Sequence, residues 1–332
     1  MSLNDAIKEW KSKKILIIGD ALIDKYIFGN ADTISPDAPV PNIKIDNSIA
    51  YIGASGLVLQ FLKSLGGNPE ICTIIGDDFE GNLFLKKIKE LNIDTSGILI
   101  DKNLTTPQIT RVKAMNQHVL RLETDYNVNI SESMIDKFFR LLENRSQDIE
   151  AILILDYGIG GLFQDLFIQK LLKKLREIYN NIPIIVRPTV SNYYLYENVD
   201  LIKMNLQKAL QTFSIDCCTE TSISIAGKRI LNSSKCDHVL LNFLELESYL
   251  FSKNYEKIEK ILPILKQPAR SYVAVGSVIM ATLGLSFAAK IQVFDAVRLA
   301  LFSAALSASL PPVEFYDSLK LRDYISANLE DK

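Results

Sequence analysis

Glycine is scarce in this chain: 15 of its 332 residues are glycine, whereas average usage is about 7%. The distribution is also uneven, because twelve glycines lie in the first 161 residues and only Gly227, Gly276 and Gly284 follow. Glycine allows consecutive backbone N–H groups to turn toward one ligand. The C-terminal half therefore has few loops that could close on a phosphate.

A surplus of charge is lacking as well. Lys and Arg total 37 and Asp and Glu total 39, so the formal net charge is -2. This balance excludes a global field that would hold nucleic acid or an anionic membrane, and any anionic ligand must be held locally. The four cysteines show no metal-binding spacing and predict buried free thiols in a reducing compartment: Cys72, Cys217, Cys218 and Cys236. We expect no metal site from them.

Long apolar segments are rare. The first fourteen residues, MSLNDAIKEWKSKK, are charged and contain no apolar stretch of the kind found in secretion signals, so we expect a cytoplasmic protein. Residues 272–289 carry no charge, but they include Ser, Thr and Gly, and Asp295 and Arg298 follow soon after. We interpret this region and the apolar run that follows it as two buried helices rather than a membrane span.

The remaining pattern is that of an α/β protein. Hydrophobic residues make up 48% of the chain and charged residues 23%, enough for one large core or two unequal lobes. Residues 13–20 form an apolar run that ends in Gly-Asp, which is typical of a central parallel strand that stops at a ligand crevice. Strands and helices alternate from about residue 130, which predicts a doubly wound, mostly parallel sheet flanked by helices. The predicted strands are 151–157, 182–188, 199–205, 237–243 and 247–252, and the predicted helices are 131–145, 164–179, 219–232 and an all-helical region at 276–309.

Two earlier segments follow a different period. Residues 40–52 and 106–123 alternate between polar and apolar side chains, as strands do when one face meets water. They flank a predicted helix at 57–65, a strand at 71–76 and an amphipathic helix at 79–91. We predict one domain over residues 1–332, with a small β lid inserted at about 25–52 and 105–124.

A family resemblance rests on these same segments. Residues 19–45, GDALIDKYIFGNADTISPDAPVPNIKI, resemble the N-terminal signature of ribokinase-like carbohydrate kinases. Within them, ISPDAPVP at 34–41 is similar to the heptose-7-phosphate kinases of lipopolysaccharide precursor synthesis, and TRVKAMNQHVLRLE at 110–123 extends the similarity. The resemblance implies a kinase that uses MgATP on a sugar phosphate, closes a β lid over the sugar and often dimerises through that lid.

The resemblance also exposes losses in the nucleotide half. The family's catalytic Gly-Ala-Gly-Asp turn reads Ala274-Val275-Gly276-Ser277, and an unactivated Ser277 hydroxyl cannot replace the aspartate that accepts a proton. The family's magnesium-ordering Asn-x-x-Glu begins at Asn205 but ends at Lys208. Asn205 and Gly276 are thus the remnants of nucleotide binding. The other aligned substitutions are Arg187-Pro188-Thr189 for Asp-Pro-Lys, Ile159 for the Lys of Asp-Tyr-x-Lys-Gly, and 242–247 for a glycine-containing nucleotide loop.

Structural alternatives stay open at these positions. Ser277 could N-cap a buried helix, and Lys208 could be a solvated lysine on a helix surface. If the chain is an active kinase with substituted machinery, Glu245 or Glu247 could supply the base. ATP and Mg are cofactors only under that alternative, and otherwise we expect none.

The sugar half is better preserved. Asp20 and Asp24 match strand-end carboxylates that accept hydrogen bonds from sugar hydroxyls, although Asp20 could instead cap the turn after its strand. The family's Gly-Gly-Ala-Ala-Asn loop begins at Gly53 and has Leu57 in place of its sugar-binding Asn. The lid candidates for clamping a sugar phosphate, or alternatively for forming a solvated face or a dimer rim, are Arg111, Lys113, Asn116, Gln117 and Arg121.

Three hypotheses follow. The first is a degenerate sugar kinase that retains the fold and lid, lacks phosphoryl transfer and acts as a binding or partner subunit, as a homodimer or a heterodimer with an active paralogue. The second is an active ATP-dependent carbohydrate kinase. The third is a scaffold without a ligand. None of them involves nucleic acid or a membrane.

Overall fold

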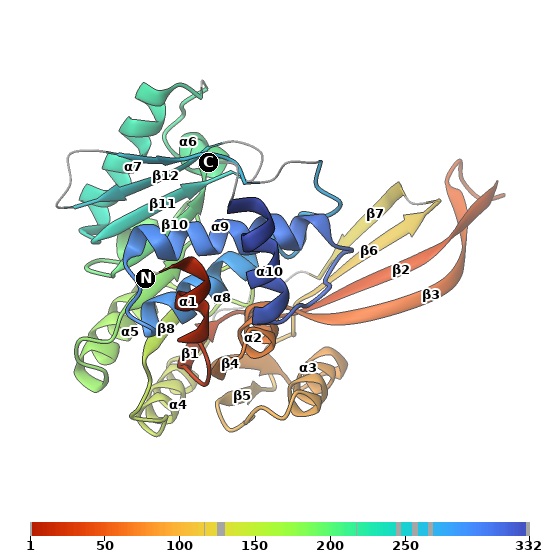
Figure 1. Cartoon of the computed structure of the whole chain (residues 1–332). Coiled ribbons are helices and arrows are strands. Elements are labelled where there is room, and N and C mark those ends of the chain that lie inside the picture. Colours follow the sequence, from red (N-terminus) through yellow and green to blue (C-terminus); the bar gives the residue numbers. More distant parts are fainter. Residues whose placement is uncertain are drawn as a thin grey trace.

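The largest feature of the molecule is a central β-sheet. The computed structural model describes residues 2–115, 117–124, 130–216, 218–243, 247–253, 258–264 and 268–329. Within these ranges the sheet has nine strands in the order β13-β12-β11-β10-β9-β8-β1-β4-β5 (Figure 1). The strands are β1 Lys14–Gly19, β4 Asn68–Gly76, β5 Ile98–Asp101, β8 Ala151–Leu155, β9 Ile184–Arg187, β10 Leu201–Asn205, β11 His238–Asn242, β12 Ser248–Ser252 and β13 Glu259–Ile261.

Most neighbouring strands of this sheet are parallel. All pairs from β5 across to β11 are parallel, and only the pairs β11–β12 and β12–β13 are antiparallel. The predicted doubly wound, mostly parallel α/β sheet is therefore confirmed. The strands β5 and β13 and the last helix, α10, were not predicted. Short strands and a terminal helix show little hydrophobic periodicity in the sequence.

Helices cover both faces of the sheet. Alternate residues of β1 point to opposite sides, with Ile15 and Ile17 in one hydrophobic core and Leu16 and Ile18 in the other. The first core is covered by α1 Leu3–Lys8, α2 Ser55–Ser64, α3 Phe79–Glu90, α8 Val275–Ala288, α9 Val293–Ser309 and α10 Ser318–Leu329. The second is covered by α4 Glu132–Glu143, α5 Asp165–Ile178, η1 Tyr193–Leu195, α6 Leu206–Thr212 and α7 Glu220–Ser234.

The strand order reverses next to β1. β1 pairs with β4 on one side and with β8 on the other, so the chain winds outward in two directions from this point. In doubly wound sheets the crevice at such a switch point, beyond the carboxyl ends of the strands, is where ligands bind. Asp20 follows β1 and Asp156 follows β8, which brings two carboxylates to this crevice.

A second sheet projects from the body as an arm (Figure 1). Its order is β3-β2-β6-β7, with β2 Ala21–Ile34, β3 Pro41–Ala54, β6 Gln108–Ala114 and β7 Gln117–Glu123. β2 and β6 are parallel, and the other two pairs are antiparallel. A small separate sheet was predicted and is present. Residues 106–123 supply two of its strands, because the chain reverses after Ala114 and returns as β7.

The uncharged region at 272–289 lies in the body. It contributes a single helix, α8, whose residues are almost all buried, and α9 follows it. No helix in the described ranges is long and apolar enough to cross a membrane. The prediction that these segments are core helices is confirmed. Among the cysteines, Cys72 and Cys236 are buried free thiols, Cys218 is free but exposed, and Cys217 lies outside the described residues.

Candidate functional site

Asp20 holds a glycine-containing loop over the switch-point crevice. Its Oδ2 accepts hydrogen bonds from the backbone N–H groups of Tyr157 at 2.9 Å and Ile159 at 3.3 Å. The loop can turn toward the carboxylate because Gly158 and Gly160 adopt φ values of 70° and 76°, a region that favours glycine. Asp20 therefore caps the loop after β8, not the turn after its own strand.

The second oxygen of Asp20 has no partner. Oδ1 is buried and makes no hydrogen bond among the described residues. Burial, and secondarily the charge of Asp156, raise the pKa of Asp20 well above its ordinary value. Asp156 is itself held by Asn192 and Tyr196, whose side chains donate to its Oδ2 at 2.5 and 2.8 Å. The crevice thus offers one carboxyl oxygen without a partner, on Asp20, under the 158–161 loop.

Asp24 is paired within the protein. Its carboxylate forms a largely buried ion pair with the partly buried guanidinium of Arg111, although the two residues lie on different lid strands, β2 and β6. Parallel pairing aligns Tyr26 with Arg111, which places the guanidinium 5.3 Å and the Lys113 ammonium 5.8 Å from the Tyr26 ring. Arg111 and Lys113 thus share a face, as their spacing indicated, but Asp24 and Arg111 neutralise each other.

The other lid candidates lie farther along the arm. Arg121 stands opposite Arg111 on β7 and forms an ion pair with Glu123. Gln117 is exposed at the start of β7, and Asn116 lies outside the described residues. Gly53 pairs with Leu22, and a Cβ on it would lie 2.9 Å from the Leu22 side chain and 3.3 Å from the Cβ of Asp24. Gly53 therefore allows β3 to approach Asp24 closely.

The turn that carries catalysis in the resembled family begins α8 here. The N-cap is Ala274 and it has no side-chain capping bond, so the proposal that Ser277 caps this helix was wrong. Ser277 lies inside the first turn and is buried. The amides of Val275, Ser277 and Val278 donate to the carbonyls of Tyr272 and Ala274, which leaves them unavailable to a ligand. The turn therefore lacks both a base and the set of free N–H groups that stabilises developing charge.

A cavity of about 460 Å³ opens at the carboxyl ends of β9 and β10. Arg187, Lys203 and Lys208 line it, and no Asp or Glu is found among the described lining residues. Arg187 lies 3.8 Å over the ring of Tyr157 and donates to the carbonyl of Asp156 at 2.9 Å. The remaining lining residues are Pro188, Thr189, Val190, Met204, Asn205, Gln211 and Thr212.

Lys203 is the most unusual residue in this cavity. Its side chain is buried, and burial together with the nearby charges of Arg187 and Lys208 lowers its pKa from 10.5 to about 7. Lys203 lies within the predicted strand 199–205 and was not predicted as a site residue. The signal available was a single lysine within an otherwise apolar run, LIKM, where a charge is costly.

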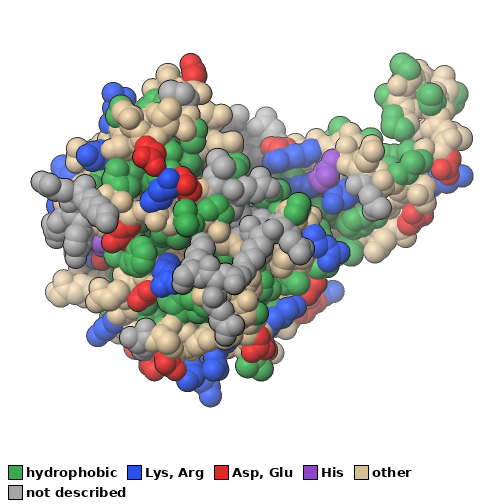
Figure 2. Space-filling view, turned by 45° about the horizontal axis from the view of Figure 1, so that its top comes forward, with side chains coloured by type: hydrophobic (Ala, Val, Ile, Leu, Met, Phe, Trp, Pro, Cys, Tyr) green, Lys and Arg blue, Asp and Glu red, His purple; other side chains and the backbone are tan. Residues whose placement is uncertain are grey.

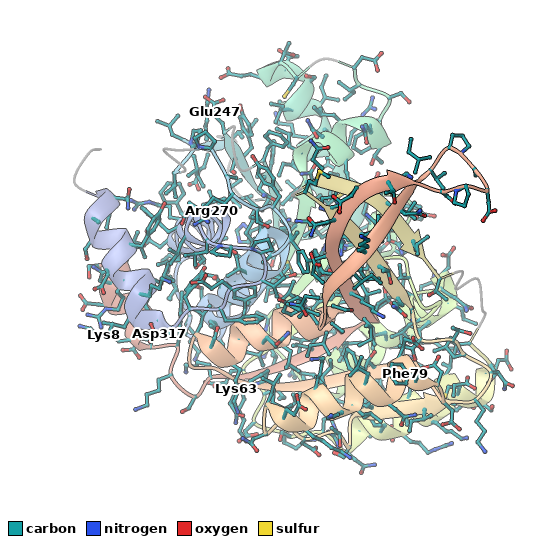
Figure 3. All side chains as sticks on the ribbon, turned by 90° about the vertical axis from the view of Figure 1, so that its right-hand side faces the viewer. Lys8, Lys63, Phe79, Glu247, Arg270 and Asp317 are labelled. Carbon is teal, nitrogen blue, oxygen red and sulfur yellow. The ribbon has the colours of Figure 1, made fainter. Side chains whose placement is uncertain are left out.

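The positions assigned to nucleotide and metal binding have other partners. The side-chain oxygen of Asn205 accepts the amide of Lys208 at 3.2 Å and so caps α6, while Lys208 is exposed at the cavity. Glu247 accepts the Tyr249 hydroxyl at 2.6 Å and pairs with Lys260 at 2.7 Å, contacts that lower its pKa and make it a weaker base. Figure 3 labels it near the top of the molecule, away from the lid. Glu245 lies outside the described residues.

These observations do not fit magnesium-dependent nucleotide chemistry. Magnesium is held by carboxylates and phosphate oxygens, but the described lining of the cavity contributes three basic side chains and no carboxylate. Elsewhere in the described ranges, no group of three or more His, Cys, Asp or Glu side chains is placed to hold a metal ion. The described lining of this cavity therefore offers no carboxylate that could hold magnesium beside a nucleotide.

No protein-family profile matches the chain. It is 28% identical over 303 residues to the bifunctional protein HldE of Campylobacter curvus, covering 89% of this chain and 61% of that protein. It is 26% identical over 328 residues to HldE of Desulfatibacillum aliphaticivorans, covering 97% and 64%. HldE is a heptose kinase and adenylyltransferase. This chain is related to the ribokinase-like heptose kinases. It spans about three fifths of the length of these HldE relatives.

Solved structures agree on the fold of this heptose kinase relative. Phosphofructokinase-2 from Escherichia coli, in complex with substrates and products, superposes with a TM-score of 0.76 at 14% identity and covers 95% of this chain and 99% of that one. Ribokinase from Arabidopsis thaliana, complexed with ribose and ATP, gives a TM-score of 0.73 at 14% identity with the same coverage. At such identities the likeness shows the ribokinase-like fold, and the chemistry must be argued from this chain's own residues.

Proposed function

We propose that this chain is a degenerate heptose-kinase-like protein, which retains the fold and the lid but does not transfer phosphate from ATP. The relationship to HldE and to ribokinase-like sugar kinases supports the sugar kinase origin. The main support for a loss of activity lies at the start of α8. Ser277 stands there in place of a carboxylate, and three of the first four backbone amides of the helix donate to backbone carbonyls. General-base catalysis alone contributes typically ~10²–10⁴-fold to a rate.

The sugar half supports a retained binding role. Asp20 keeps one buried carboxyl oxygen without a partner beneath the 158–161 loop, and a carboxyl oxygen there suits a hydrogen bond with a sugar hydroxyl. Arg111 and Lys113 present positive charge from β6, although Arg111 is already paired with Asp24. A sugar phosphate is thus the ligand class that this half fits.

The test of the proposed function is turnover. ADP release would be measured with millimolar MgATP, with and without D-glycero-D-manno-heptose 7-phosphate, beside the variant Ser277→Ala. We expect the sugar phosphate to add no turnover and MgATP to cause no thermal shift. Sugar-dependent ADP release that Ser277→Ala abolishes would show an active kinase with Ser277 in its machinery, and the proposal would be wrong.

The lid supports a role as a partner subunit. Exposed apolar side chains lie on its two edge strands, with Ile45 and Ile49 on β3 and Leu120 and Leu122 on β7. Figure 2 shows hydrophobic side chains along the projecting arm. Edge strands also offer unpaired backbone groups to another chain. We propose that a second copy of this chain, or a related subunit with the same lid, pairs there, and the mass in solution by light scattering tests it.

A further inference from the structure

The cationic cavity at β9 and β10 is not explained by a lost kinase site alone. Loss of a metal site removes carboxylates, but here positive groups occupy the region: Arg187 at the end of β9, Lys203 in β10 and Lys208 in α6. Like charges at one cavity repel one another and destabilise the empty protein. A ligand of negative charge would remove this cost.

Lys203 carries the strongest part of the argument. Only 6% of its surface is exposed, and within the described residues its ammonium has neither an ion-pair partner nor a hydrogen bond. The charged groups that face it are Arg187 and Lys208, and both are cations. Long charged side chains are almost never this buried without a partner.

A helix end adds to the same field. A Cβ placed on Gly276 would lie 4.0 Å from the Lys203 ammonium, so this lysine stands beside the first turn of α8. Helix N-termini carry a partial positive charge, which favours an anion and disfavours a neighbouring cation. The Lys203 ammonium therefore lies in a positive electrostatic potential, which favours the binding of a negatively charged group.

We propose that this cavity binds a phosphate group directly, without a divalent metal ion. The inference rests on the proposed function, since it assumes that MgATP no longer occupies this edge of the sheet. Arg187 is held in place by Tyr157 and by the Asp156 carbonyl, so its remaining donors are preorganised for phosphate oxygens. A volume of about 460 Å³ is within the range of small-molecule sites and exceeds the need of one free ion. A phosphate ester of a small molecule fits it.

Calorimetry on the full chain tests the proposal. Inorganic phosphate would be titrated in EDTA and again with millimolar magnesium, into the wild type and the variants Lys203→Met, Lys208→Met and Lys86→Met. Lys86 is an exposed lysine of α3 and serves as the matched control. We expect binding in EDTA that magnesium leaves unchanged, a loss of at least about tenfold in Lys203→Met, a few-fold loss in Lys208→Met and no change in Lys86→Met.

Several results would overturn the proposal. They are no binding of phosphate or its esters, binding only in the presence of magnesium, or equal affinity in the wild type and Lys203→Met. A circular dichroism melt would accompany each variant. Methionine retains the length of the lysine stem and removes the buried charge, so we expect Lys203→Met to fold.

Further titrations identify the source of the phosphate group. Inorganic phosphate, heptose 7-phosphate and AMP would be compared in EDTA, each with the wild type and Lys203→Met. A Lys203-dependent ligand that binds at least tenfold more tightly than inorganic phosphate identifies the ester, and equal affinities identify the free ion. Kinase turnover with intact metal-free phosphate binding would refute the proposed function only, whereas inactivity without any phosphate binding would refute this inference only.

Discussion

The two halves of the crevice at the carboxyl ends of the strands differ in how their charges are balanced. Beyond β1 and β8, and in the adjoining lid, the carboxyl groups of Asp20, Asp24 and Asp156 each have at least one partner within the protein, although Oδ1 of Asp20 has none among the described residues. Beyond β9 and β10, the buried cation Lys203 has none in the described part of the chain. The first half is stabilised largely by its own contacts, whereas the second half holds a buried lysine next to two other basic side chains.

This difference assigns different roles to charges that look alike in the sequence. A buried charge with partners holds elements of the fold together, and removing one partner should weaken the protein. A buried charge without a partner weakens the protein by itself, and removing it should strengthen the protein. Substitutions on the two sides are therefore expected to change stability in opposite directions.

The largest effect is expected for Lys203→Met. The pKa of Lys203 falls from 10.5 to about 7 on folding, and each pKa unit corresponds to about 1.4 kcal/mol. Below pH 7 the buried ammonium therefore costs on the order of 4–5 kcal/mol. We expect the variant to be more stable than the wild type by up to about this amount in urea unfolding at pH 6.5.

The pH dependence sharpens this prediction. Between pH 7 and 10.5 the unfolded chain holds a proton on Lys203 that the folded chain has released, so wild-type stability rises with pH. The advantage of Lys203→Met should shrink to about 1–2 kcal/mol at pH 9.5. The matched exposed variant Lys86→Met should stay within about 0.5 kcal/mol of wild type. A variant Lys203→Met that is less stable than wild type at pH 6.5 would contradict the comparison.

On the other side, Arg111→Met should destabilise the protein. It leaves the buried Asp24 carboxylate without its partner, and breaking such a pair costs about 3–5 kcal/mol. The double variant Asp24→Asn with Arg111→Met should recover most of the loss, because no charge remains unpaired. Urea unfolding of the wild type, both single variants and the double variant gives the coupling energy. Additive losses in the double variant would show that the two side chains do not act as a pair.

For both halves, the sequence predicted the strands and helices better than it predicted which charged side chains have partners. Apolar runs such as 151–155 predict the strands, and the alternation of strands with helices predicts a parallel sheet. Both patterns can be recognised because they are local in the sequence. The pairing of Asp24 with Arg111 is not local, since it depends on β2 lying parallel to β6. Lys203 lay within a correctly predicted strand, but its isolation depends on α6, α8 and β9, which meet only in the folded chain.

The start of α8 shows the same limit. The spacing of apolar residues indicated a helix from about 276, yet the cap is Ala274 and not Ser277, because the helix starts where the backbone dihedrals turn helical rather than where a capping side chain occurs. The absence of a base at Ser277 was readable from the residue type. The sequence did not reveal that the neighbouring backbone amides donate hydrogen bonds to backbone carbonyls.

A third prediction concerns Asp20. Burial raises its pKa, so the folded protein keeps a proton that the unfolded chain releases above pH of about 4. The contribution of Asp20 to the stability of the wild type is therefore fully present at low pH. It is lost as the pH rises toward and through the pKa that Asp20 has in the folded protein. Asp20→Asn retains an acceptor for the amides of Tyr157 and Ile159 but does not titrate. Its melting temperature relative to wild type should increase from pH 4 to pH 7, and a constant difference would show that Asp20 is ionised throughout.

The smallest effect on stability is expected in the lid, where charge balance does not decide the outcome. Leu122 on β7 is 52% exposed and Leu319 on α10 is 58% exposed. Replacing either with Glu should change unfolding free energy by less than about 0.5 kcal/mol, since neither side chain is in the core. If the edge strand β7 pairs with another copy, Leu122→Glu places like charges across that contact and lowers the mass measured by light scattering, whereas Leu319→Glu does not. A monomeric wild type, or an equal loss of mass in both variants, would remove the lid as the association surface. It would leave the contrast between the two halves of the crevice intact, because that contrast depends only on contacts within one chain.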